Sequence, residues 1–564
     1  MSADADVVIV GLGPTGLLLA HVLGKAGHRV VVLEREPQFY GNARAVYTDD
    51  ECMRLLQSVG MADEAQAKML VETPVQLVRP DGTVLGQYAP LKQPFGWPVV
   101  NFFYQPYLET TLSDGLARYP NVSIRRGRDV IDFSQDDQGV AVVHHATQHF
   151  RFREEDDAKQ TAGREADTQT TRARFLVGAD GGRSVVRTKL GIEMTGKNFP
   201  EPWLVVDLQQ KEPDKGLRHL PYFSFVVDPQ MPTVVCVQPN GYHRFEFRLL
   251  PGDTKEDLER PETVRRLLSK WVDPDHFVVV RRLVYTFNAL VANRWRDRRV
   301  FLAGDAAHMT PQFMGQGASS GFRDAANLGW KLDLALRGLA SSELLDTYER
   351  ERKPHARSMI DISVALKDAV SMTHPVGATL RDWSVRIGQR LPGIGKWLKE
   401  GGFKPRPVYE NGSYFGLARR STRAPDGTLS PQPKVRTYDG RRVRLDELTG
   451  AGFSLVGLGV DPREGLTLRA RAFLDRIGAR YITVYAYGQR PQGLGAISRD
   501  RPAMLEEVED VDGDLIEWLQ RGGGADAIAI LRPDKFAYSV TSASAIESAL
   551  TALRVGLEGR AHGH

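Results

Sequence analysis

The sequence predicts a mixed α/β protein, in which a domain with a parallel sheet is joined to an antiparallel sheet and to a further α/β unit. Three stretches predict this fold class. Residues 6–34 alternate strand, glycine-rich turn, helix and strand. Residues 202–285 carry strand patterns such as TVVCV and HRFEFRLL, which indicate an antiparallel sheet. A new series of strands and helices, from FSLVGLGV to AIAILRP, follows residue 434.

Length and composition limit the classes of protein that this chain represents. Its 564 residues exceed one ordinary core, so two or three domains are expected. With 42% hydrophobic and 26% charged residues the chain is globular. The net charge of +4 is not gathered into a basic block, so we expect no nucleic-acid partner. Cys52 and Cys236 form no Cys-x-x-Cys pair, which excludes a disulfide framework and fits a reducing cytoplasm.

The N-terminal segment does not have the pattern expected of a signal peptide or of a membrane span. It lacks the basic region that begins a signal peptide. The most apolar stretch, 7–23, is interrupted by three glycines, Pro14 and His21, and it is shorter than the ~20 apolar residues of a spanning helix. We therefore expect a soluble, cytoplasmic protein that has no membrane partner.

The turn GLGPTG, at 11–16, has the spacing of a dinucleotide-binding site. Gly11, Gly13 and Gly16 allow a tight turn and close approach to a pyrophosphate, beside Pro14 and Thr15 at the start of a helix. Glu34 ends the next strand, where a carboxylate accepts hydrogen bonds from ribose hydroxyls. A glycine turn without a ligand is disfavoured because strand, turn, helix, strand and acid occur in order. This motif alone does not separate FAD from NAD.

Two distant segments extend the motif: FLVGADGGRSVVR at 175–187 and RVFLAGDAAHMTPQFMGQGASSGFRDAANLGWKL at 299–332. Together the three resemble the flavin motifs of the group A flavoprotein aromatic hydroxylases. Over nearly the whole length, the chain resembles the 3-(3-hydroxyphenyl)propionate hydroxylases of the phenol-hydroxylase-like subgroup. Segments FGWPVVNFFYQP, HRFEF, LVYTFNALVANRW and GGFKPRP carry that similarity.

The resemblance implies an FAD site assembled from residues far apart in sequence. Asp305 follows an apolar strand and would meet the sugar-alcohol chain of FAD; the alternative for it is a helix N-cap. The amides at the start of the next helix would stabilise negative charge on the reduced flavin. Besides Gly11, Gly13, Pro14, Thr15, Gly16 and Glu34, the expected FAD-binding residues are Arg35, Arg44, Gln105, Asp180, Gly304, Asp305, Pro311, Gly315, Gln316, Gly317 and Ala318.

The resemblance also implies a division of the chain into four parts. A Rossmann-like FAD-binding domain takes residues 1–75, 101–182 and 291–370. An antiparallel-sheet substrate domain takes 76–100 and 183–290, and a helical connector rich in Pro and Gly takes 371–434. Residues 435–564 are expected to form a thioredoxin-like domain without redox cysteines.

The reaction implied by the resemblance is hydroxylation of a phenol next to its hydroxyl, with O2 and either NADH or NADPH. No second glycine motif is present, so the nicotinamide nucleotide should bind only transiently. We expect Arg244, in HRFEF, to stabilise the phenolate, and Pro311 to lie at the reactive face of the flavin. Some relatives have a base two residues after the flavin arginine, where this chain has Val46. The candidates for the proton acceptor are Tyr104, His243, Asp49 and Asp50.

Several alternatives stay open at this stage. A flavin-dependent halogenase is the nearest enzyme rival, although its Trp-x-Trp-x-Ile-Pro motif does not occur here. Hydroxylation of a polycyclic aromatic or polyketide substrate is a further alternative. A regulator on the same fold that does not bind flavin would have no reason to keep all three motifs. His144, His145 and His149 lack a carboxylate at ligand spacing, so no metal site is expected. The sequence does not decide between a monomer and a homodimer.

Overall fold

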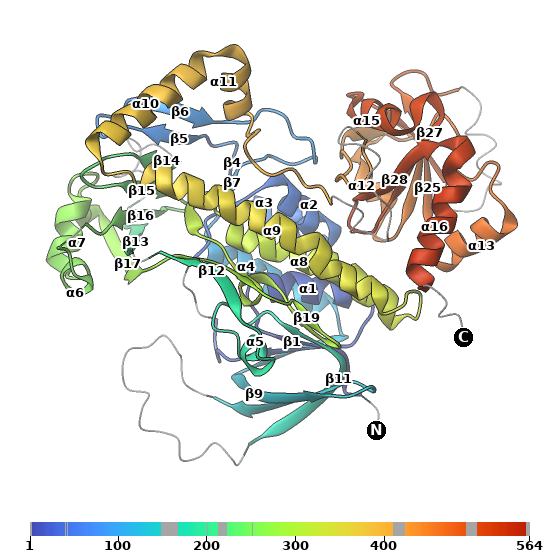
Figure 1. The fold of residues 1–564 in the computed structure, drawn as a ribbon, viewed down its shortest axis with the longest axis horizontal. Helices are drawn as coiled ribbons and strands as arrows, with labels where there is room; N and C mark the ends of the chain where they lie inside the picture. The colour runs from blue at the N-terminus through green and yellow to red at the C-terminus, as the bar shows by residue number, and fades with distance from the viewer. Residues whose placement is uncertain are drawn as a thin grey trace.

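Three large sheets organise the protein (Figure 1). The computed structural model describes residues 3–39, 41, 43–147, 167–199, 201–212, 223–250, 252–409, 424–491 and 505–559. The predicted fold class is confirmed: a mainly parallel sheet, a mainly antiparallel sheet and a C-terminal α/β unit follow one another along the chain. The exact domain boundaries remain predictions.

The first sheet is parallel at its centre, and its strand order is β19-β20-β11-β1-β2-β8. Its inner strands are continuous apolar runs because helices cover both faces. Antiparallel strands β9 and β10 extend it beside β11. The strands are β1 Ala5–Val10, β2 Val30–Glu34, β8 Val122–Arg126, β9 Arg128–Gln135, β10 Val140–Ala146, β11 Gln169–Gly178, β19 Arg296–Asp297 and β20 Val300–Leu302.

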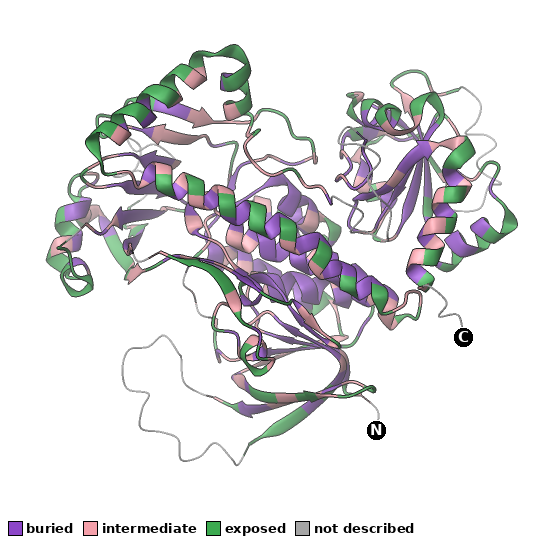
Figure 2. Ribbon diagram, in the orientation of Figure 1, coloured by how far each residue is buried: buried purple, intermediate pink, exposed green. Residues whose placement is uncertain are grey.

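Seven helices belong to this first layer. They are α1 Pro14–Lys25, α2 Asp50–Ser58, α3 Ala62–Gln66, α4 Gln105–Gly115, α5 Val185–Lys189, α8 Gln316–Leu336 and α9 Glu343–Val370. Figure 2 shows α8 buried along most of its length, whereas buried and exposed positions alternate along α9. Helix α8 begins at Gln316, directly after Gly315.

The second sheet has the strand order β17-β13-β16-β15-β14-β5-β6 and is antiparallel except where β14 pairs with β5. Short helices α6 and α7 cover one face, and the other faces α9 and the turn η4. The elements are β5 Val75–Val78, β6 Val84–Tyr88, β13 Trp203–Gln210, β14 Phe223–Val226, β15 Thr233–Val237, β16 Tyr242–Arg248, α6 Lys255–Leu258, α7 Pro261–Leu268, β17 Phe277–Tyr285 and η4 Gln312–Met314.

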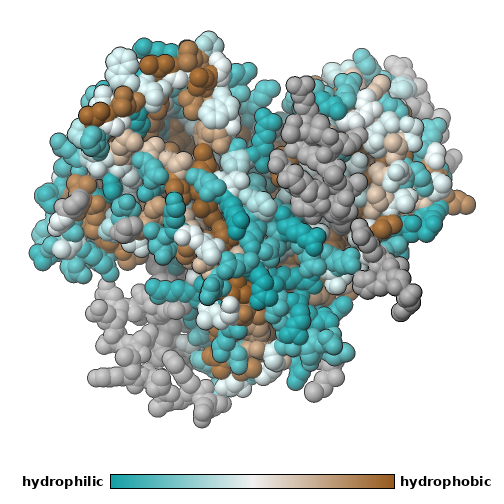
Figure 3. Space-filling model, in the orientation of Figure 1, coloured by the Kyte–Doolittle hydropathy of each residue, from teal (hydrophilic) through white to brown (hydrophobic). Residues whose placement is uncertain are grey.

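Two three-stranded sheets and two helices connect these layers. One small sheet joins β3 Tyr47–Thr48, β7 Asn101–Phe102 and β4 Leu70–Val71, and the other joins β12 Met194–Asn198, β18 Asn288–Ala292 and β21 His308–Met309. Helices α10 Pro375–Arg390 and α11 Pro392–Lys399 lie against β6. Their outer face carries the exposed apolar side chains Val376, Leu380, Trp383, Ile387, Ile394 and Trp397. Brown atoms gather over these two helices at the upper left of Figure 3.

The C-terminal unit has a mixed sheet of order β23-β22-β26-β25-β24-β27-β28. Parallel β24 and β25 are joined through α13, and antiparallel β27 and β28 lead into α16, as in thioredoxin-like folds. Its elements are β22 Lys434–Arg436, β23 Arg442–Arg444, α12 Leu445–Thr449, β24 Ser454–Leu458, α13 Leu468–Arg476, β25 Arg480–Ala486, β26 Leu505–Asp510, α15 Asp514–Gly523, β27 Ala527–Leu531, β28 Ala537–Ser542 and α16 Ile546–Glu558.

A buried ion-pair network joins this unit to the helices of the first layer. Arg532 contacts both oxygens of Glu351 on α9, at 2.8 and 2.9 Å, and Lys331 on α8 contacts the same carboxylate at 2.7 Å. The apolar core of the C-terminal unit also includes Trp330 and Leu334 of α8. The unit is therefore packed against the rest of the protein through buried ion pairs and apolar side chains. Among the helices described, none combines the length and apolar character needed to cross a membrane.

Candidate active site

The three glycine-containing motifs meet at one edge of the first sheet. The amide of Ala179, after β11, donates to the carbonyl of Val10 at 2.8 Å, and the amide of Ala303, after β20, donates to the carbonyl of Gly178 at 2.9 Å. The carboxyl ends of β1, β11 and β20 therefore lie side by side. Ligands of open α/β sheets bind at such an edge.

Close steric contacts explain several glycines of these motifs. A Cβ atom added to Gly304 or Gly321 would lie 2.5 or 2.1 Å from Oγ1 of Thr15, and one added to Gly11 would lie 2.4 Å from the carbonyl oxygen of Ala179. The first turn therefore packs directly on the two later motifs. A Cβ added to Gly13 would meet nothing within 4 Å, and the same is true of Gly317. Open space thus lies in front of the N-termini of α1 and α8.

The acidic residues of the motifs face this space or the backbone around it. Asp305 follows the buried strand β20, yet its side chain is exposed at the edge of the sheet. Surrounding protein raises the pKa of Asp305, and the nearby cation that opposes this rise is Arg44. Asp180 accepts a hydrogen bond from the amide of Val186 at 3.2 Å, and its Oδ1 is buried without a hydrogen-bond partner among the described residues.

Glu34 and Gln105 hold backbone amides at this edge. Glu34 accepts hydrogen bonds from the amides of Leu12, at 2.6 Å, and Glu36, at 2.8 Å. Gln105 Oε1 accepts hydrogen bonds from the amides of Arg44 and Ala45 at 2.6 and 2.7 Å, so it shapes the segment 43–45. Arg44 itself is exposed, and Arg35 lies with its Nη2 atom 3.5 Å from Glu36.

Arg244, on β16, is buried and bonded on several sides. Its guanidinium donates to both oxygens of Asp207, at 2.6 and 3.3 Å. It also donates to the carbonyls of Arg44, at 2.7 Å, and Ala43, at 2.6 Å. Arg281 of β17 donates to the same Asp207 and the same Ala43 carbonyl. Burial opposes the charge of Arg244, but Asp207 outweighs it and raises the pKa of Arg244.

A set of aromatic side chains adjoins this cluster. Glu246 lies two residues beyond Arg244, on the same face of β16, and accepts a hydrogen bond from the side-chain amide of Gln312. The preceding residue, Pro311, is fixed by a hydrogen bond of 2.6 Å from the hydroxyl of Ser363 to its carbonyl. The neighbouring rings are Trp203, Phe223, Phe225, Tyr285, Phe287 and Phe313.

Comparison with known proteins places the chain in a family. The family described as FAD binding domain matches residues 4–363, and the one described as HcaD C-terminal domain matches 427–556. The 3-(3-hydroxy-phenyl)propionate/3-hydroxycinnamic acid hydroxylase of Paraburkholderia xenovorans (strain LB400) is 36% identical, over 95% of this chain and 88% of its own length. The protein of that name from Comamonas testosteroni is 35% identical over 96% and 94%.

The chain belongs to the FAD-dependent aromatic hydroxylases. Solved structures agree with this family. Aklavinone-11 hydroxylase, in complex with FAD and aklavinone, superposes with a TM-score of 0.74 and 23% identity, over 98% of this chain and 99% of its own. The p-nitrophenol 4-monooxygenase of Pseudomonas putida superposes with a TM-score of 0.63 and 26% identity, over 72% and 98%. FAD is thus the cofactor of this hydroxylase.

Two of the candidate proton acceptors lie in surroundings that disfavour proton transfer from a substrate, and their catalytic roles remain predictions. His243 points away from Arg244 on β16, because neighbouring side chains of a strand face opposite sides. Its ring packs 4.6 Å from that of Phe245, neither ring nitrogen has a hydrogen-bond partner among the described residues, and burial lowers its pKa to about 3. It is therefore a neutral core residue.

Asp49 lies between two cations, which disfavour its protonation. It is the N-cap of α2 and contacts Arg323 at 2.5 Å and Lys404 at 2.7 Å. Burial alone would raise its pKa, but these two cations hold the pKa of Asp49 well below its usual range. Asp50, next to it, has a pKa raised by burial to about 7. The ring of Tyr104 stacks on that of Tyr242 at 3.8 Å, and its catalytic role remains a prediction.

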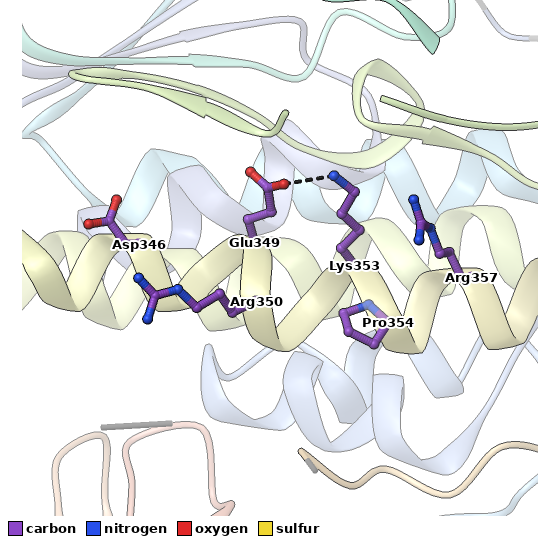
Figure 4. A pocket seen from close by; sticks show the side chains of 6 residues that line it. All are labelled: Asp346, Glu349, Arg350, Lys353, Pro354 and Arg357. Atoms are coloured by element: carbon purple, nitrogen blue, oxygen red, sulfur yellow. Dashed lines mark hydrogen bonds and ion pairs between the residues drawn. The ribbon is translucent and has the colours of Figure 1, made fainter. Parts of the chain in front are cut away.

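The open hollows of the surface lie elsewhere. One is a charged depression along the outer side of α9, where Lys353 contacts Glu349 at 2.7 Å (Figure 4). Another lies between α8 and the C-terminal unit and is lined by Trp330, Tyr409 and Phe536. Neither hollow is lined by any of the expected FAD-binding residues, and the FAD site follows instead from the geometry of the motifs. In the described ranges, no group of three or more His, Cys, Asp or Glu side chains is arranged to hold a metal ion, and His149 lies outside those ranges.

Sequence reasoning missed Asp207, Glu246, Gln312 and Lys404. The pattern HRFEF contained one usable signal, because Arg244 and Glu246 are two residues apart in a strand and so share a face. Asp207 and Lys404 gave no such signal. They reach the site from a separate strand and from the connector after α11.

Proposed function

We propose that this hydroxylase uses O2 and NADH or NADPH to hydroxylate a phenolic ring at the carbon next to its hydroxyl. A substrate of the 3-(3-hydroxyphenyl)propionate type is favoured because two relatives named for it are 35–36% identical over nearly the whole chain. The observation that carries the proposal is the aromatic face beside Pro311, next to a buried charged cluster. It provides an apolar surface for a ring and polar groups for a hydroxyl.

The chain offers a fitting site for FAD at the edge of the first sheet. Open space at Gly13 and Gly317, the exposed carboxylate of Asp305 and the unpaired oxygen of Asp180 match a large ligand with phosphate and hydroxyl groups. The N-termini of α1 and α8 favour negative charge there. FAD, when bound, supplies the redox chemistry that transfers one oxygen atom of O2 to the substrate.

The charged cluster and the aromatic side chains position the substrate and influence the ionisation of its hydroxyl. The two arginines that hold Asp207 also hold the carbonyl of Ala43, so the segment beside Arg44 keeps one conformation. Side chains such as Phe313 and Trp203 exclude water, which strengthens electrostatic interactions in the site. Positive charge near the phenol oxygen then favours its ionised form, in which the ring is a better nucleophile.

Turnover with a panel of phenols tests this proposal. Purified protein with bound FAD is mixed with NADH or NADPH, O2 and a series of hydroxylated aromatics that includes 3-(3-hydroxyphenyl)propionate. We expect substrate-dependent NAD(P)H oxidation and a catechol product that is 16 mass units heavier by the addition of one oxygen atom. Failure of every simple phenol, with turnover of a polycyclic phenol instead, would favour the rival substrate class. Hydrogen peroxide measured in parallel separates productive turnover from uncoupled oxidation.

A further inference from the structure

We propose that Glu246 accepts the proton of the substrate's phenolic hydroxyl. This inference rests on the proposed function and gives it the base that is missing at Val46. The motifs of the FAD site do not include Glu246, and no sequence pattern assigned it a role.

The two oxygens of Glu246 have different surroundings. Oε2 accepts the hydrogen bond from Gln312. Oε1 lies 4.0 Å from Nη1 of Arg244 and accepts no hydrogen bond among the described residues. The residue is only 5% exposed, so its contact with bulk water is small. One oxygen of a buried carboxylate therefore remains available to a donor, and a buried carboxylate favours such a partner.

The position of Glu246 is right for a substrate beside the flavin. Its partner Gln312 directly follows Pro311. Arg244 donates a hydrogen bond to the carbonyl of Arg44, and the charge of Arg44 opposes the rise in the pKa of Asp305. Across the sheet, Glu246 pairs in register with Val205 and Val234, and the rings of Phe225 and Phe313 lie on that face. A phenol ring among these side chains would place its hydroxyl within reach of Oε1.

The charge of the cluster allows the proton to move. The charged and titratable groups that face Glu246 are Arg244 from its own strand, Asp207, Arg281 and Tyr285 from β13 and β17, and Cys236 from β15. Two arginines and one aspartate leave one positive charge in excess. A single negative charge balances it, whether on Glu246 or on a phenolate. Burial raises the pKa of Glu246 to about 7 against the attraction of Arg244, so both protonation states are accessible near neutral pH.

The step itself conserves atoms and charge. The O–H bond of the phenol breaks, its proton forms an O–H bond with Oε1 of Glu246, and the electron pair stays on the phenol oxygen. The phenolate that results attracts the positive charge of Arg244. The protonated carboxyl keeps its hydrogen bond from Gln312 and loses its proton to solvent after product leaves.

Binding measurements on the oxidised FAD-loaded protein, without NAD(P)H, test the proposal. The Kd values of 3-(3-hydroxyphenyl)propionate and of its O-methyl ether are to be measured from pH 6 to 8.5 by the change in flavin absorbance. The phenol should bind roughly tenfold more tightly as Glu246 ionises through pH 7, because a charged acceptor strengthens the hydrogen bond. The ether has no proton to donate and should lack this increase. Glu246→Gln should remove this difference between the phenol and the ether. The control Glu259→Gln changes a residue directly after α6, which accepts a hydrogen bond from the amide of Val284, and it should keep the difference.

Turnover adds a second readout. Wild-type kcat should fall below pH 7, and the rate of Glu246→Gln should instead rise toward the phenol's own pKa of about 10. The proposal is overturned if the Kd of the ether changes with pH as that of the phenol does in the wild-type protein. It is also overturned if Glu246→Gln keeps the wild-type pH dependence of both Kd and kcat, because Glu246 would then only position Gln312. The wild-type comparison decides this even if the variant does not fold. Absence of phenol hydroxylation by the wild type would instead refute the proposed function.

Discussion

Nη1 of Arg244 donates a hydrogen bond of 2.7 Å to the carbonyl of Arg44, 200 residues earlier in the chain. This bond joins the second sheet to the segment that turns beside the FAD site. We predict that Arg244→Met leaves Asp207 with one arginine and destabilises the protein by about 3–5 kcal/mol, because a buried carboxylate loses a partner. FAD retention should fall with it. Thermal unfolding followed by flavin fluorescence measures both, and the exposed neighbour Arg282→Met serves as the control.

Asp305 should contribute directly to FAD affinity. Its carboxylate is exposed at the edge of the first sheet and makes no structural ion pair among the described residues, so Asp305→Ala removes a ligand contact and little else. A lost charged hydrogen bond of roughly 1.5–3 kcal/mol corresponds to about 10–100-fold weaker binding. Equilibrium dialysis of the flavin measures this change. Asp63→Ala, on the exposed side of α3, should bind FAD normally, and equal affinity in the two variants would remove Asp305 from the site.

Two glycines of the flavin motifs should separate effects on folding from effects on FAD binding. Gly13→Ala adds a methyl group into open space, so the apoprotein should keep its Tm while FAD loading falls. Gly304→Ala should lower the Tm itself, because its Cβ would lie 2.5 Å from Thr15 Oγ1 and its φ is +62°. Gly393→Ala, on α11, has open space and no flavin nearby, so it controls for the change of residue type. Full FAD loading of Gly13→Ala would contradict this assignment.

Docking of the C-terminal unit should depend on pH through Glu351. Burial raises the pKa of Glu351, but Arg532 and Lys331 outweigh it and lower that pKa to about 2. A carboxylate with a lowered folded-state pKa stabilises the protein above its unfolded pKa of about 4.3, and this stabilisation is lost as the pH falls toward 2. Its size is on the order of 3 kcal/mol.

Urea unfolding between pH 5 and pH 3 should reveal this dependence. The wild-type midpoint should fall more steeply than that of Glu351→Gln, which has no carboxylate to protonate. Glu343→Gln, exposed at the start of the same helix, should behave as the wild type does. Parallel curves for wild type and Glu351→Gln would show that the ion pair to Arg532 contributes no pH-dependent stability.

The sequence alone determined the family, the cofactor motifs and the order of the three fold units. These features are local: glycine spacing, apolar strand runs and the acids that follow them are encoded within 10 to 35 neighbouring residues. Gly11, Asp180 and Asp305 were therefore identifiable before their strands were seen side by side.

Only the tertiary structure decided which polar residues share a space and which protonation states they hold. The direction of a side chain along β16 separates His243 from Arg244, and strands or helices distant in sequence bring Asp207, Gln312 and Lys404 to their partners. Two cations hold the pKa of Asp49 well below its usual range, whereas burial raises the pKa of Glu246 to about 7 against the attraction of Arg244 and Arg281. Such differences arise because desolvation and charge pairing depend on groups far apart in the chain, which no local pattern encodes.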